Sequence, residues 1–216
     1  MTRHVRNADV RDETTRVEAF SDGVFAIAMT LLILEIRTPE RLGAGQLLHA
    51  LFVLWPSYLA FATSFFTIGV MWMNHHRLFN LIGKSDQALL AINGLLLFSI
   101  TFIPFPTALL ARYLNHPDSR IAAILYNAVF LFSALCFQGL LRHASGRGGH
   151  LLDPAADPES VVAVRRQYRF GPLLYILLIG VSCISAIASL VFNLILATFF
   201  AIPSNWFRRG RNTMSS

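Results

Sequence analysis

Residues 16–36 read RVEAFSDGVFAIAMTLLILEI. The stretch is apolar over most of its length, yet it carries an arginine, a serine-aspartate pair, a threonine and a glutamate. A charge near the centre of a membrane helix costs about 2.5 to 3.5 kcal/mol on insertion scales, so a membrane helix that keeps charges must pair them or use them. Its length of about 20 residues predicts a first membrane span over about residues 18–36.

The composition of the whole chain is typical of a polytopic membrane protein. Of the 216 residues, 55% are hydrophobic and 14% are charged, and the mean hydropathy is +0.54. Soluble domains carry about 25% charged residues, and a soluble core could not cover this much apolar surface. The formal net charge of +6 comes from basic residues between apolar runs, which favours control of membrane orientation over nucleic-acid binding.

Further apolar runs predict an all-α fold with six transmembrane helices. The predicted spans after the first cover about residues 46–73, 87–112 and 121–141, followed by two in the run 170–203. The polar, Gly- and Pro-rich stretch 142–159 is the longest predicted loop. The predicted organisation is an amino tail over 1–15, a six-helix channel domain over 16–207 and a carboxyl tail over 208–216.

Prolines and serines predict where these spans bend or turn. Pro56 should kink the second span, and Pro104 and Pro106 should distort the second half of the third. The run 170–203 is too long for one span of about 20 residues. It is therefore predicted to turn near 182–189, where serines and alanines cluster.

The distribution of basic residues predicts the orientation in the membrane. With six spans, fourteen Lys and Arg residues lie on the side of the two termini and four lie on the other side. Cytoplasmic loops carry the excess of basic residues. Both termini are therefore predicted to be cytoplasmic, in a multi-pass protein of the plasma membrane.

Two motifs resemble the signature of the transmembrane protein 175 family, the lysosomal and prokaryotic potassium channels. The first is Arg16-x-x-x-Phe20-Ser21-Asp22 followed by GVFAIAMTLLILEI, and the second is the WMNHH segment at 72–76. A single six-helix unit resembles the prokaryotic form. The resemblance implies a homotetrameric potassium channel with the first helix lining the pore, K⁺ as the permeant ion, and no cofactor.

The resemblance also implies which residues meet the ion. The pore constriction falls on Ile27, Leu31 and Leu34, with the hydroxyl of Thr30 nearby. At about 100° per residue, these residues form one stripe on a helix and Asp22 lies on the opposite side. The motif residues Arg16, Phe20, Ser21 and Asp22 are then expected to form a structural network, with Trp72, Asn74 and His75 as partners.

Other interpretations of these residues are open. A stripe of Ile and Leu also suits contact with lipid or a neighbouring helix, and Glu35 is expected to be solvated at the mouth. The alternative function is a proton- or cation-coupled secondary transporter with Asp22, Glu35 and His75 as relay groups, although no internal repeat is visible. A hydrogen-bonded role for His75 and His76 is favoured over a metal site, because no further ligand has a fitting spacing.

The sequence argues against an enzyme. It contains no H-E-x-x-H or G-x-S-x-G motif and no catalytic acid pair. It also contains no TVGYG-like filter, so a cage of backbone carbonyls is not the predicted basis of ion selectivity.

Overall fold

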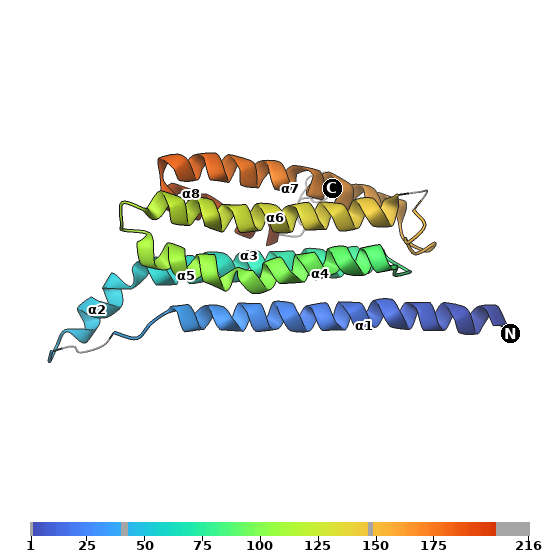
Figure 1. Cartoon of the computed structure of the whole chain (residues 1–216), viewed down its shortest axis with the longest axis horizontal. Helices are drawn as coiled ribbons and strands as arrows, with labels where there is room; N and C mark the ends of the chain where they lie inside the picture. Colours follow the sequence, from blue (N-terminus) through green and yellow to red (C-terminus); the bar gives the residue numbers. More distant parts are fainter. Residues whose placement is uncertain (1, 40–42, 147–148, 202–216) are drawn as a thin grey trace, which may run out of the picture.

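The computed structural model describes residues 2–39, 43–146 and 149–201, and in these ranges the chain is a bundle of helices (Figure 1). The predicted sixth-helix end beyond 201, the carboxyl tail 208–216 and residues 40–42 lie outside the described residues. The elements are α1 (Thr2–Leu31), η1 (Leu32–Glu35), α2 (Leu47–Val53), α3 (Trp55–Phe79), α4 (Gln87–Phe102), α5 (Pro104–Tyr113), α6 (Ser119–Ser145), α7 (Pro158–Ile184) and α8 (Ala186–Ala201).

The all-α membrane fold predicted from the sequence is confirmed. Among the described residues, four segments are long and apolar enough to cross a membrane, namely 13–35, 87–113, 119–145 and 158–184. The bent pair α2–α3 makes a fifth. The sixth predicted span corresponds to α8, whose 16 described residues are fewer than the roughly 20 of a full span.

The helices are interrupted at each place where a bend or turn is predicted. The axes of α2 and α3 meet at 48°, with Pro56 in the first turn of α3, and α4 gives way to α5 at Ile103, directly before Pro104. Proline lacks the N–H that would continue the preceding helix and suits the first turn of a new one. The final apolar run turns at Ser185, whose extended backbone separates α7 from α8.

Two helices begin earlier than the apolar pattern predicts. The first helix already begins at Thr2 in place of about residue 18, and α7 begins at Pro158 in place of 170. Asp157 starts α7 because its carboxylate accepts a hydrogen bond from the backbone N–H of Ser160 at 3.0 Å. Apolar runs mark the part of a helix that lies in the membrane, and polar residues can extend the same helix into water.

Polar side chains hold the helices together inside the bundle. Asn127 on α6 donates to Ser182 and Ser189, at 3.0 and 2.8 Å, and its carbonyl accepts from Asn193 on α8 at 2.9 Å. Ser64 on α3 bonds both Thr107 on α5 and the Tyr126 hydroxyl on α6. Lipid is as apolar as leucine, so packing and such bonds specify the arrangement of membrane helices.

Candidate pore helix and its polar anchor

The first helix lies along one side of the bundle, packed against α3 and α4 (Figure 1). The inward face of α1 and of the following η1 is covered: Ser21 and Leu32 are 0% exposed and Phe25 is 1% exposed. On the opposite face, Ile27 is 60% exposed and Leu34, which lies in η1, is 70% exposed. Thr30 is also exposed and Leu31 is 38% exposed, so all four predicted pore residues reach the surface of the subunit.

A buried chain of hydrogen bonds fixes the inward face. His75 Nε2 donates to Asn93 Oδ1 at 3.0 Å, Asn93 Nδ2 donates to Ser21 Oγ at 3.0 Å, and Ser21 donates to the Val17 carbonyl at 2.8 Å. The direction is determined because amide and backbone carbonyl oxygens can only accept. This series of hydrogen bonds links α3 and α4 to α1, and its three side chains, those of His75, Asn93 and Ser21, are almost completely buried.

Two further bonds connect α1 to α3 beside this chain. Trp72 Nε1 donates to Asp22 Oδ1 at 2.9 Å, and His76 Nδ1 donates to Glu18 Oε1 at 2.8 Å. Trp72 and His76 are four residues apart on α3, and Glu18 and Asp22 are four residues apart on α1. The two bonds therefore lie on one face of each helix, one turn apart. The Trp72 and His76 rings stack with centroids 6.4 Å apart.

The structure divides the motif residues into two groups. Ser21 and Asp22 face the bundle, whereas Arg16 and Phe20 are exposed, Phe20 to 68%. The partners also separate, because Asn74 does not bond to α1. Its side-chain carbonyl accepts from Gln167 at 3.1 Å and its backbone carbonyl accepts from the Tyr168 hydroxyl at 2.8 Å, which ties α3 to α7.

Sequence reasoning missed Asn93 and the bond between Glu18 and His76. Asn93 had a visible signal, because it is the one amide in the apolar run ALLAINGLLLF at 88–98. A polar side chain in such a run is expensive unless it finds a partner. For Glu18 and His76 there was no such signal, since both lie at the polar end of a span.

Removal of the bond between Trp72 and Asp22 should weaken the fold and leave ion preference unchanged. We expect Asp22→Ala and Trp72→Phe each to lower the thermal stability of the assembled protein, by about 0.5–1.5 kcal/mol for one lost hydrogen bond. The double variant should lose less than the sum of the two, because both single changes remove the same bond. Trp55→Phe, at an exposed tryptophan without this bond, is the matched control. A changed reversal potential at unchanged stability would contradict the structural role.

The fold and the anchored first helix define a polytopic helical membrane protein. A model of the family described as Endosomal/lysosomal potassium channel TMEM175 matches residues 16–104. A potassium channel of Chamaesiphon minutus is 50% identical over 200 residues, 92% of this chain and 98% of the relative. A potassium channel of Streptomyces collinus is 45% identical over 190 residues, 88% of this chain and 92% of the relative.

A solved structure agrees with this comparison. The crystal structure of a lysosomal potassium-selective channel TMEM175 homolog from Chamaesiphon minutus matches with a TM-score of 0.80 and 50% identity, covering 88% of this chain and 97% of that one. The chain therefore belongs to the TMEM175 family.

Proposed function

We propose that this protein is a potassium-favouring cation channel whose pore is lined by α1 on the axis of a homotetramer. The observation that carries the proposal is the exposed apolar face of α1 and η1, with Ile27 and Leu34 at 60% and 70% exposure. The names of the two bacterial relatives, both potassium channels, support it. Since α1 lies at the edge of its own bundle, a path lined by this face requires further copies of the chain.

The exposed face can control ion flow through its lack of polarity. Four copies of Ile27, Leu31 and Leu34 would form successive apolar rings around the axis. A narrow apolar constriction is costly for a hydrated ion and can close by losing its water. In this mechanism, small changes in the width of the rings determine whether the path is wet and conducting.

Thr30 supplies a polar surface next to these rings. Its hydroxyl donates to the Ile27 carbonyl at 2.8 Å, so its proton is already used within α1. The lone pairs of the hydroxyl oxygen are left to accept or to coordinate. Because the side chain is exposed on the proposed pore face, four Thr30 oxygens would offset part of the cost of ion dehydration.

The proposed location is the plasma membrane, with both termini in the cytoplasm. The support is the distribution of Lys and Arg, fourteen on the side of the termini and four on the other. In this orientation the bonds of Glu18 and Asp22 with α3 lie toward the cytoplasmic end of the membrane-spanning segment 13–35.

Reconstitution into liposomes tests the channel function. We expect potassium to flow down its gradient without a proton gradient, and single-molecule recordings to show discrete current steps, because a channel provides a continuous path. Sodium flux under the same gradient measures the preference. The same sample should have the mass of four copies in detergent or lipid.

Two results would reject the proposal. Potassium flux that stops when the proton gradient is removed, without unitary currents, would favour the coupled transporter. A monomeric, fully active protein would exclude a pore on a symmetry axis.

A further inference from the structure

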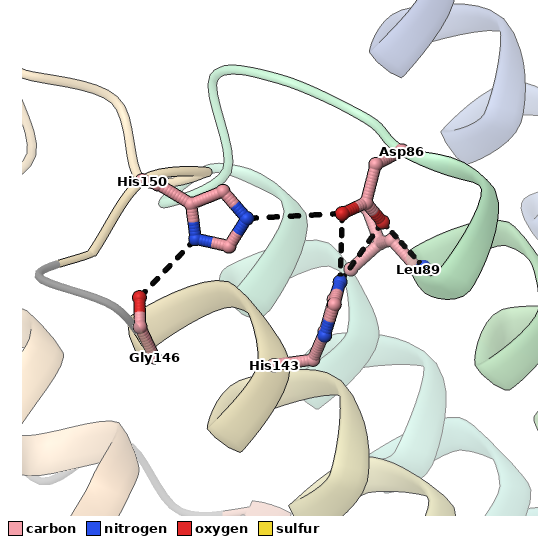
Figure 2. Close-up of polar contacts among 5 residues, drawn as sticks. All are labelled: Asp86, Leu89, His143, Gly146 and His150. Atoms are coloured by element: carbon pink, nitrogen blue, oxygen red, sulfur yellow. Dashed lines mark hydrogen bonds and ion pairs between the residues drawn. The ribbon is translucent and has the colours of Figure 1, made fainter.

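Three potential metal ligands meet where two loops pair at one end of the bundle. They are Asp86, which begins α4, His143 in the last turn of α6, and His150 in the loop before α7 (Figure 2). Backbone pairing holds the loops together: Gly83 N–H donates to the Leu151 carbonyl at 2.9 Å, and Asp153 N–H donates to that of Leu81 at 2.9 Å. The ligands therefore converge from segments far apart in sequence.

The two distances from Asp86 to the histidines bracket the ligand spacing of a tetrahedral metal ion. His143 Nε2 lies 2.9 Å from each carboxylate oxygen of Asp86, and His150 Nε2 lies 3.7 Å from Oδ2. One ligand atom from each residue can be chosen so that all three lie within 4.8 Å of one another. Zinc bonds of about 2.0–2.1 Å in tetrahedral geometry place ligand atoms about 3.3 Å apart, which lies between the two observed distances.

The outer contact of His150 prepares its ring for a metal. His150 Nδ1 donates to the Gly146 carbonyl at 3.2 Å, so in the neutral ring Nε2 carries the lone pair (Figure 2). That nitrogen faces the Asp86 carboxylate at a distance too long for a hydrogen bond. Metal-binding histidines commonly donate their second ring N–H to a backbone carbonyl in this way.

Asp86 is held in the charged form that binds a cation. The backbone N–H of Leu89, 2.7 Å from Oδ1, is the main cause that keeps the pKa of Asp86 below its usual value, and the bond from His143 adds to it against the effect of burial. The side chains of Asp86, His143 and His150 remain 29–38% exposed. Solvent can therefore reach a fourth coordination position.

We propose that Asp86, His143 and His150 form a binding site for a divalent transition metal ion of the Zn²⁺ type. Imidazole and carboxylate ligands suit zinc and its neighbours among the first-row metals. The proton that His143 Nε2 now donates to Asp86 would leave that nitrogen, for Nδ1 or for solvent, when the metal takes its place. A bound ion would join the start of α4, the end of α6 and the loop before α7.

The test uses the full-length, tag-free protein, treated with a chelator and then titrated with Zn²⁺ alone. We expect one ion per chain, a rise in melting temperature, and a Co²⁺ spectrum of a tetrahedral site. His150→Ala and Asp86→Asn should each weaken binding by at least the roughly 10- to 100-fold that loss of a partner one step from a metal costs. Asparagine retains the ability to cap α4, so Asp86→Asn removes the charge and one carboxylate oxygen while keeping the helix cap.

His116→Ala is the matched control. His116 also lies beside a carboxylate, at 3.2 Å from Asp118, and both side chains are more than half exposed. The His116→Ala variant should bind Zn²⁺ like the unaltered protein. The proposal is overturned if His150→Ala binds as tightly as the unaltered protein while melting normally in chelator, or if His116→Ala loses binding to the same extent.

Discussion

Replacement of Ile27 by asparagine should raise the ion flux and move the permeability ratio of potassium to sodium toward one. Ile27 is 60% exposed on the proposed pore face, so the change should leave packing within the subunit intact. An amide that offsets about 1.4 kcal/mol of the dehydration cost at the constriction would raise the flux about tenfold. Reversal potentials and single-channel conductance in lipid bilayers measure both effects.

Ile121→Asn is the matched control for this substitution. Ile121 is an isoleucine of similar exposure, 67%, on α6, and it takes no part in the proposed pore. Its replacement should leave the reversal potential unchanged. If Ile27→Asn also conducts and selects like the unaltered protein, Ile27 does not form the constriction.

Replacement of Asn93 by leucine should lower the stability of the assembled protein more than any other substitution proposed for α1 and its contacts. The variant leaves His75 Nε2–H without its acceptor and Ser21 Oγ without its donor, both in fully buried surroundings. Each unsatisfied buried group costs about 1–3 kcal/mol, so the expected loss is about 2–6 kcal/mol. The measurement is the fraction of assembled protein that survives heating, analysed by size-exclusion chromatography.

Two further variants make this prediction specific. Asn115→Leu, at an exposed asparagine between α5 and α6, should change little. Addition of Ser21→Ala to Asn93→Leu should recover part of the loss, because it removes one of the unsatisfied groups. If Asn93→Leu is as stable as Asn115→Leu, the buried hydrogen bonds of Asn93 do not hold α1 in place.

The bilayer explains why the sequence predicts the fold well. The apolar core of a membrane imposes a length of about 20 residues on each span, and backbone chemistry determines that Pro56 and Pro104 fall at bends. The same reasoning misplaced the starts of α1 and α7, because the water-exposed ends of these helices carry no apolar signal. Capping by Asp157 is the local feature that would have placed the start of α7.

Contacts between helices were harder to predict than the helices themselves. Periodicity placed Asp22 opposite Ile27, but the choice between Trp72, Asn74 and His75 as its neighbour depends on the rotation of α3. Rotation is determined by packing of the whole bundle, which a single sequence does not reveal. The approach of His143 and His150 to Asp86 has the same origin, since it depends on the pairing of two loops.

The hydrogen bonds that join α1 to α3 and α4 hold its membrane-spanning segment near one end. In the described part of the chain, the hydrogen bonds of Glu18, Ser21 and Asp22 lie toward the start of the membrane-spanning segment 13–35, and directional bonds fix both rotation and register. Beyond them, Phe25 and Leu32 make apolar contacts, which are non-directional and tolerate sliding. When a helix is fixed at one place, a residue can be displaced further the greater its distance from that place. Ile27 lies about 8 Å from Asp22, and Leu34 lies about 20 Å away. In the proposed pore, the ring at Ile27 should therefore keep a nearly constant diameter, and the ring at Leu34 should be the easier one to widen.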